Sequence, residues 1–279
     1  MIDQHTKNPP KLIASDLDGT LLDSGARLSD ANRDAIYEMV KRGAHFVPTS
    51  GRAHYEIISQ VRDLDCVRYV ISSNGARVYD KKTGRSIETL IEKEDYAAIY
   101  DIMKNYTVYL TMHHEGMTFV DEELSDRDTM DYYGINEYYK KHIKKTCVKM
   151  PHFNDYFDTP RNVEMVCGFF KYDSELKDCI QKLSAIKGIF VTSSAACSLE
   201  ILSAKATKGA AVISLAKELG IDIADTVAVG DSLNDLTMIQ KAGLGVATAN
   251  AVDALKDAAD LTVCSNDENV AVCLLERLF

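Results

Sequence analysis

The sequence predicts an α/β protein, in which a doubly wound, Rossmann-like parallel sheet is interrupted by an inserted α+β domain. Short apolar strands alternate with helix patterns at both ends of the chain, and this alternation is lost between residues 88 and 198. A length of 279 residues also exceeds what one compact core usually needs. We therefore expect a core domain formed by residues 1–87 and 199–279, and a cap domain formed by residues 88–198.

The first part of the core alternates strand and helix signals. Its predicted strands are nearly all apolar, which is typical of a parallel sheet covered on both faces: Lys11–Asp16, His45–Ser50 and Tyr69–Ser73. Ser29 is a suitable helix N-cap and Gly43 a suitable stop, so we expect a helix between them. A second helix is predicted around Tyr55–Leu64.

The middle of the chain has longer strands with one polar face, which indicates an antiparallel sheet. The predicted strands are Thr107–His113, Met117–Val120, Val163–Lys171 and Gly188–Ser194. The predicted helices are Lys93–Asn105, Ser125–Lys141 and Ser174–Ile186.

Strand–helix alternation returns in the last part of the chain. Helices are predicted at Lys208–Leu219, Leu233–Ala242, Val252–Ala258 and Asn269–Leu278, with strands at Thr226–Gly230, Leu244–Ala247 and Leu261–Cys264. We expect these strands to join the sheet begun by the first part of the chain.

Composition limits the partners and the compartment. The formal net charge is −10, which argues against nucleic acid, because neutralising phosphates needs an excess of basic residues. Seven cysteines without a CxxC pair argue against a disulfide framework or a cysteine zinc site and favour reduced thiols. The polar start and the lack of a long apolar run predict a cytoplasmic chain without a membrane partner. The sequence gives no signal for the oligomeric state.

The most informative segment is Asp16-Leu17-Asp18-Gly19, which ends an apolar strand. Two acids at i and i+2 lie on the same side of an extended chain, and ligands bind beyond the carboxyl ends of strands in an open α/β sheet. Such close carboxylates repel each other unless a cation is present, and Mg²⁺ prefers oxygen ligands. A strand-end turn with solvated aspartates is the alternative, and this segment alone does not decide between them.

Three further polar groups follow the same pattern. Asp231 begins an acidic cluster after the predicted strand that ends at Gly230, and Ser50-Gly51-Arg52 ends another strand with a hydroxyl and free amides. Lys208 begins a predicted helix, where a cation and free N–H groups can together hold an anion. All of these groups lie at the end of a predicted strand or the start of a predicted helix. This common position favours a phosphate and metal site over solvated turns without a function.

These segments, DLDGTLL, SGR, the Lys208 region and GDSLND, resemble the four motifs of the haloacid dehalogenase superfamily, in order. SSNGA (residues 72–76) and GVATANA (residues 245–251) resemble its Cof-like sugar-phosphatase subfamily, which carries a large α/β cap between the second and third motifs. The chain departs from that subfamily at Thr248-Ala249, where Met-Gly is usual, and at Ser50, where threonine is common. Lys205 is a rival for the third motif, but Lys208-Gly209 fits better because it opens a helix.

The resemblance implies a role for each acid. Asp16 would be the nucleophile and a magnesium ligand. Asp18 would be the general acid and base, with its backbone carbonyl as a second ligand, and Asp231 would be the third protein ligand. An acid two residues after the nucleophile favours a phosphatase over a dehalogenase, because a halide leaving group needs no proton.

The resemblance also implies a set of phosphate-binding groups. These are the backbone amides of Leu17 and Gly51 and the side chains of Ser50, Lys208 and Asn234. Asn74 and Asn250 would line the site, and Asp235 would support the metal through water or orient Lys208.

The function implied is that of a Mg²⁺-dependent phosphatase that hydrolyses small phosphorylated metabolites, sugar phosphates first among them, through an aspartyl phosphate. A phosphomutase using the same intermediate remains an alternative. A non-catalytic phosphate sensor is a third reading, which the acid–base residue Asp18 disfavours, since a sensor has no use for it.

Overall fold

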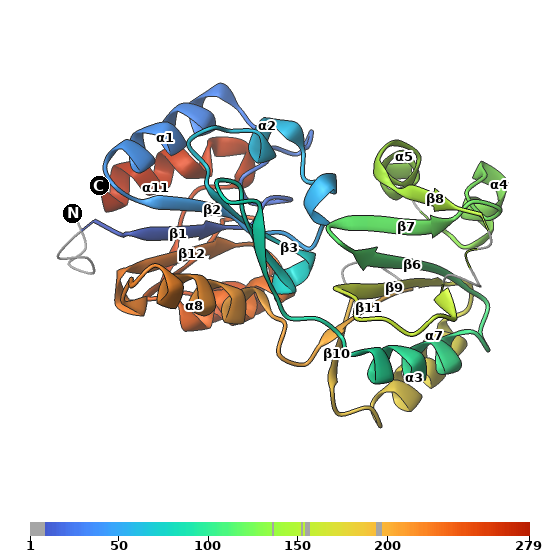
Figure 1. The fold of residues 1–279 in the computed structure, drawn as a ribbon. Helices are drawn as coiled ribbons and strands as arrows, with labels where there is room; N and C mark the ends of the chain where they lie inside the picture. Colours follow the sequence, from blue (N-terminus) through green and yellow to red (C-terminus); the bar gives the residue numbers. More distant parts are fainter. Residues whose placement is uncertain (1–8, 136, 152, 154–156, 194–196) are drawn as a thin grey trace. The chain divides into compact units, whose positions relative to one another are not determined.

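The computed structural model describes residues 9–135, 137–151, 153, 157–193 and 197–279. The chain forms two compact units (Figure 1). One unit, the core, contains residues up to Gly51 together with Ile57–Ile87 and Thr207–Phe279. The other, the cap, contains Arg52–Glu56 and Glu88–Ala206.

The core is built on a parallel sheet. Its strand order in the described chain is β14-β13-β12-β1-β2, and every pair is parallel: β14 (Leu261–Thr262), β13 (Leu244–Ala247), β12 (Thr226–Gly230), β1 (Leu12–Ser15) and β2 (His45–Pro48). Strand β3 (Tyr69–Ser72) lies beside the end of β2, where Thr49 forms a parallel bridge with Ile71. All residues of β1, β12 and β13 are buried, as expected for a sheet covered on both faces.

Helices cover both faces of this sheet (Figure 1). One apolar cluster joins the sheet to α1 (Asp30–Lys41), α2 (Ser59–Arg62) and α11 (Val270–Leu278). A second cluster joins it to α8 (Lys208–Glu218), α9 (Leu236–Lys241) and α10 (Asp253–Ala258). The predicted doubly wound fold is therefore confirmed.

Local sequence signals explain where the core helices begin and end. The Ser29 side chain accepts a hydrogen bond from Asn32 N–H at the start of α1, and Gly43 follows its end with φ +99°. Thr207 caps α8 in the same way, accepting from Ala210 N–H. This cap fixes Lys208 as the first residue of α8.

The cap is built on a mixed sheet of order β10-β11-β9-β6-β7-β8. Its strands are β6 (Val108–His114), β7 (Met117–Asp121), β8 (Val148–Met150), β9 (Met165–Phe170), β10 (Ile189–Thr192) and β11 (Ser198–Ser203). Helices α3 (Lys93–Met103) and α7 (Asp173–Leu183) share an apolar cluster with this sheet. The expected antiparallel character of the sheet is confirmed for β6, β7, β9, β10 and β11, whereas β8, which was not predicted, pairs with β7 in parallel.

Two predicted helices are wrong as single elements. The segment Tyr55–Leu64 forms a short 3₁₀ turn (η1, His54–Glu56) and then α2, because the chain passes from the cap back to the core after Glu56. The segment Ser125–Lys141 forms α4 (Arg127–Tyr132) and α5 (Glu137–Thr146). Gly134 has φ +69° between them, which ends the first helix.

Other features of the structure were not expected. Strands β4 (Arg77–Asp80) and β5 (Arg85–Glu88) extend β3 into a small sheet of order β3-β4-β5. Strand β11 pairs with β9 and β10 in the cap, whereas the expected domain boundary at residue 198 assigned its residues almost entirely to the core.

Cys264 and Cys273 form a disulfide, so the expectation of reduced thiols is wrong for this pair. Among the described residues, no helix combines the length and apolar composition needed to cross a membrane.

Candidate active site

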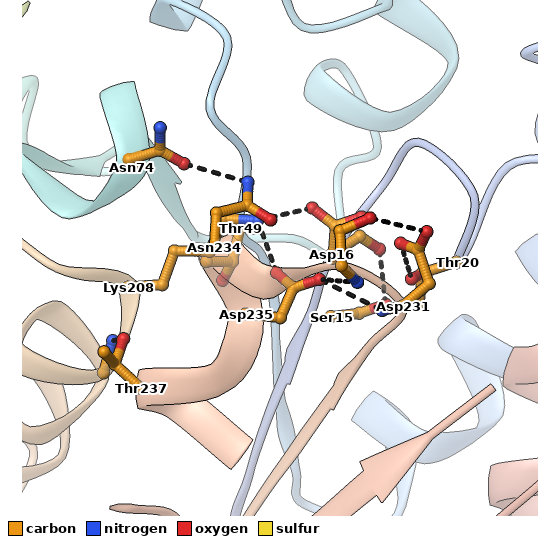
Figure 2. A network of polar contacts seen from close by, with 12 residues as sticks. Ser15, Asp16, Thr20, Thr49, Asn74, Lys208, Asp231, Asn234, Asp235 and Thr237 are labelled. Atoms are coloured by element: carbon orange, nitrogen blue, oxygen red, sulfur yellow. Dashed lines mark hydrogen bonds and ion pairs between the residues drawn. The ribbon is translucent and has the colours of Figure 1, made fainter. Parts of the chain in front are cut away.

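Two carboxylates meet at the carboxyl ends of neighbouring core strands. Asp16 follows β1 and Asp231 follows β12, and the Asp16 amide donates to Val229 O at 2.9 Å. Carboxylate oxygens of Asp16, Asp231 and Asp235 all lie within 4.8 Å of one another (Figure 2). The structure thus brings Asp16 together with two acids that lie more than 200 residues away in the sequence.

Lys208 lies among these acids. Its Nζ donates to Asp16 Oδ1 and to Asp235 Oδ1, each at 2.6 Å, and its side chain is fully buried (Figure 2). Helix α8 comes close to α9 here because Gly209 has no side chain, and a Cβ at Gly209 would lie 2.3 Å from Thr237 O. The rival candidate Lys205 is exposed, and Lys208 alone of the two makes these contacts.

Asp235 is occupied by protein contacts on both carboxylate oxygens. Oδ1 accepts from Lys208, and Oδ2 accepts from the backbone N–H groups of Asp231 and Ser232, each at 3.0 Å. Asp231 is held by hydroxyls instead, since Thr20 Oγ1 and Ser232 Oγ donate to its two oxygens at 2.9 Å. Asp235 therefore fixes the Asp231 loop and Lys208 together.

The electrostatics show an excess of negative charge. Burial raises the pKa of Asp16 well above its usual value, and the nearby Asp235 raises it further, against the effect of Lys208. Burial and Asp235 also raise the pKa of Asp231. Burial alone would lower the pKa of Lys208, but Asp16 and Asp235 outweigh it and raise that pKa. One ammonium thus faces three carboxylates.

This donor set suits a divalent cation of the hard type. Asp16 and Asp231 each offer carboxylate oxygens in the acidic cluster, and hard cations prefer oxygen ligands. Burial raises the pKa values of both groups, and the charge of the nearby Asp235 raises them further. A cation between Asp16 and Asp231 would relieve this repulsion.

The turn after Asp16 lies next to the acidic cluster. Asp18 is exposed, and Gly19 has φ +81°. A Cβ at Gly19 would lie 2.6 Å from Asp231 Oδ2, so only glycine permits both this conformation and this approach. Leu17 is buried, and its carbonyl accepts from Leu22 N–H at 2.9 Å to close the turn.

A second group of predicted residues joins the ends of β2 and β3 to the segment after β12. The backbone N–H of Asn74 donates to Ser50 O at 3.0 Å. The side chain of Asn74 accepts at Oδ1 from Asn234 Nδ2 at 3.2 Å (Figure 2). Gly51 faces the same asparagine, because a Cβ there would lie 3.1 Å from Asn74 Oδ1. Asn74 itself has the left-handed conformation (φ 51°) that asparagine tolerates better than most residues.

Asn250 contacts the backbone of the turn that follows Asp16. It is exposed, and its Nδ2 donates to Gly19 O at 2.8 Å. Sequence reasoning missed three other polar residues around this turn and the Asp231 loop: Thr20, Ser232 and Asn266. Thr20 and Ser232 each lie inside a predicted motif, so their hydroxyls could have been predicted as site residues from the sequence. Asn266 gave no such signal.

Comparison with known proteins identifies the family. The family model described as haloacid dehalogenase-like hydrolase matches residues 13–274. The chain therefore belongs to the haloacid dehalogenase-like hydrolases, and the superfamily resemblance read from its four motifs is confirmed. Within that family it is a phosphatase.

Three relatives illustrate the similarity. Phosphatase YwpJ of Bacillus subtilis is 32% identical, over 96% of this chain and 99% of its own. The 5-amino-6-(5-phospho-D-ribitylamino)uracil phosphatase YwtE of the same organism is 31% identical, over 96% of this chain and 98% of its own. A solved haloacid dehalogenase-like hydrolase from Bacillus subtilis is 30% identical, with a TM-score of 0.81 over 96% of this chain and all of its own.

Proposed function

We propose that the chain is a Mg²⁺-dependent phosphatase that hydrolyses phosphate monoesters of small metabolites, sugar phosphates first among them, through a phosphorylated Asp16. The observation that carries this proposal is the buried contact of Lys208 with Asp16 and Asp235, beside Asp231. This arrangement holds one Asp16 oxygen on an ammonium and leaves the other as the attacking atom.

The first chemical step is transfer of the phosphoryl group. An Asp16 oxygen attacks phosphorus, a new P–O bond forms, and the bond between phosphorus and the substrate oxygen breaks. Asp18 gives its proton to the departing oxygen, which leaves as a neutral alcohol. The exposure of Asp18 suits this role, because its carboxyl is accessible to a bound substrate.

The second step restores the enzyme. Asp18, now a carboxylate, takes a proton from water, and the resulting hydroxide attacks phosphorus. The P–O bond to Asp16 breaks, inorganic phosphate leaves, and Asp18 is protonated for the next cycle. The same residue therefore serves as acid and then as base.

Charge on the transferring group is balanced by the surrounding groups. Lys208, the Ser50 hydroxyl, Asn234 and the amides of Leu17 and Gly51 would contact phosphate oxygens. Asp16, Asp231 and the Asp18 carbonyl would hold Mg²⁺, which supplies electrostatic stabilisation of the phosphoryl oxygens when bound. Asn74 would orient Asn234, and Asp235 would orient Lys208.

The relatives support hydrolysis of a metabolite that carries a sugar or sugar-alcohol phosphate. YwtE, at 31% identity, is named for a ribitylamino-uracil phosphate, whose phosphate is an alkyl monoester. An alkyl leaving group needs a proton, which matches an acid at position 18. The phosphomutase alternative has less support, because these relatives carry phosphatase names.

The proposed function is tested by measuring phosphate release across a panel of sugar, sugar-alcohol and nucleotide monophosphates with Mg²⁺. The panel includes the ribitylamino-uracil phosphate for which YwtE is named. We expect equal amounts of inorganic phosphate and free alcohol from the best substrate. Transfer to a second sugar, with little free phosphate, would support the mutase instead.

A further inference from the structure

The turn that carries Asp18 is held at two of its carbonyl groups by two asparagines from a distant part of the chain. We propose that Asn250 and Asn266 are positioning residues, which fix this turn so that the Asp18 carboxyl meets the leaving oxygen. The proposal rests on the acid–base role given to Asp18 above. Neither asparagine is expected to contact the substrate or the metal.

The contacts form one connected chain. Asn250 Nδ2 donates to Gly19 O at 2.8 Å, and Asn266 Nδ2 donates to Leu22 O at 3.0 Å. The two asparagines are themselves linked, because the backbone N–H of Asn266 donates to Asn250 Oδ1 at 2.9 Å. The turn from Asp18 to Leu22 is thus bound near both of its ends.

The segment that supplies Asn266 is firmly anchored. Asn266 is only 8% exposed and begins a 3₁₀ turn (η5, Asn266–Glu268) closed by a capping box between Ser265 and Glu268. Its neighbour Asp267 accepts from the amide and the hydroxyl of Ser24 at 2.8 and 2.7 Å. The segment also lies between the two cysteines of the Cys264–Cys273 disulfide.

Asp18 itself forms a parallel bridge with Leu22, the residue whose carbonyl Asn266 holds. Thr20 Oγ1 binds Asp231, and Leu22 N–H binds Leu17 O, whereas the carbonyl of Gly19, the residue next to Asp18, is held by Asn250. Asp18 is exposed, whereas Asp16 is buried at the end of β1. Loss of the asparagine contacts would therefore displace Asp18 while leaving Asp16 in place.

This difference predicts a specific kinetic effect. Removing an asparagine should impair proton donation to the leaving oxygen more than attack by Asp16. An alkyl phosphate needs that proton, whereas p-nitrophenolate leaves without one. We expect Asn250→Ala and Asn266→Ala to lower kcat/KM for an alkyl phosphate about tenfold more than for p-nitrophenyl phosphate, since small misplacements cost up to about 10²-fold.

The experiment measures kcat/KM for both substrates in the intact protein, because this parameter reports the steps up to the phosphorylated Asp16. Asp18→Asn is the reference, and it should show the same selectivity to a larger extent. Asn105→Ala is the matched control: Asn105 also donates to a backbone carbonyl, that of Asp101, but in the cap. Asn250 is exposed, so its variant keeps the test valid if Asn266→Ala does not fold.

The outcomes distinguish the positioning role of the two asparagines from the acid role of Asp18. Selective loss in Asp18→Asn and in both asparagine variants supports the positioning role. Selective loss in Asp18→Asn, with equal losses for both substrates in the asparagine variants, overturns the positioning role and leaves the proposed function intact. No selectivity in Asp18→Asn itself overturns the acid role of Asp18, and the positioning role with it.

Discussion

Lys208 Nζ lies 2.6 Å from Asp235 Oδ1, and neither side chain is exposed to solvent. The same ammonium contacts Asp16, so a pair that is costly to bury also fixes the proposed nucleophile. Asp235 also accepts from the backbone N–H groups of Asp231 and Ser232, so its carboxylate connects Lys208 to the Asp231 loop. The stability of the core and the geometry of the site are therefore linked through Asp235.

We expect Asp235→Asn to lower the free energy of unfolding by about 1.5–3 kcal/mol, because it weakens the charge-assisted hydrogen bonds to Lys208 and the Asp231 loop while Asp16 still pairs with Lys208. Equilibrium denaturation by urea measures this change. The matched control is Asp101→Asn, which removes a surface pair with Lys104 whose side chains are 67% and 44% exposed. That control should change stability by less than about 1 kcal/mol. Equal effects in the two variants would contradict the importance of the buried pair.

Thr248 stands where the Cof-like subfamily usually has methionine, and its side chain is fully buried. Among the described residues, none accepts from or donates to its Oγ1. Because an unsatisfied buried hydroxyl costs about 1–3 kcal/mol, Thr248→Val should raise the free energy of unfolding by about 1 kcal/mol or more. Thr248→Ala, which also removes a methyl group, should gain less. A clear loss of stability in the valine variant would show that the hydroxyl is satisfied by water.

Asp80 gives a pH-dependent prediction. Arg68 donates to both of its carboxylate oxygens, at 3.0 and 2.8 Å, and holds the pKa of Asp80 well below its usual range. Stability from a lowered pKa is fully present above the unfolded-state value, about 3.9, and is lost as pH falls through the folded-state value. Asp80→Asn should therefore destabilise the protein at about pH 7, and the difference should shrink below about pH 4. Denaturation of both proteins across this range measures it, and a difference independent of pH would contradict the assignment.

Removal of the divalent cation should abolish turnover without unfolding the core. We expect EDTA to stop phosphate release and added Mg²⁺ to restore it, with Asp231→Asn requiring more Mg²⁺ for half-maximal activity. Calorimetric titration with Mg²⁺ alone gives a second reading that does not depend on turnover. Full activity in EDTA would remove the metal from the proposed mechanism.

Sequence patterns predicted the parts of the fold that local signals control. The buried strands of the core and the cap of α1 at Ser29 follow from apolar runs and a capping residue. Asp16, Lys208 and Asp231 were singled out because each lies where a strand ends or a helix begins, and the structure places their side chains close together. The segment Tyr55–Leu64 was predicted wrongly, since its helical pattern does not reveal that the chain changes unit after Glu56.

Contacts between residues far apart in the chain could not be predicted from the sequence. Asn266 lies in a polar turn that matches no motif. Only folding brings its side-chain amide to Leu22 O. The Cys264–Cys273 disulfide was missed for the same reason, because an odd cysteine count does not show which two meet. Strands β4 and β5 are short and partly exposed, so they lack the apolar run that identifies β1.

The most direct test of the central claim is the rate of phosphate release by Asp16→Asn, measured with the best substrate and Mg²⁺. Asn keeps the size of the side chain but is a far weaker nucleophile, so we expect kcat to fall by at least about 10³-fold while the protein stays folded. Asp101→Asn, a surface change of the same chemistry, should retain full activity. Undiminished turnover in folded Asp16→Asn would contradict the claim that Asp16 carries the phosphoryl group.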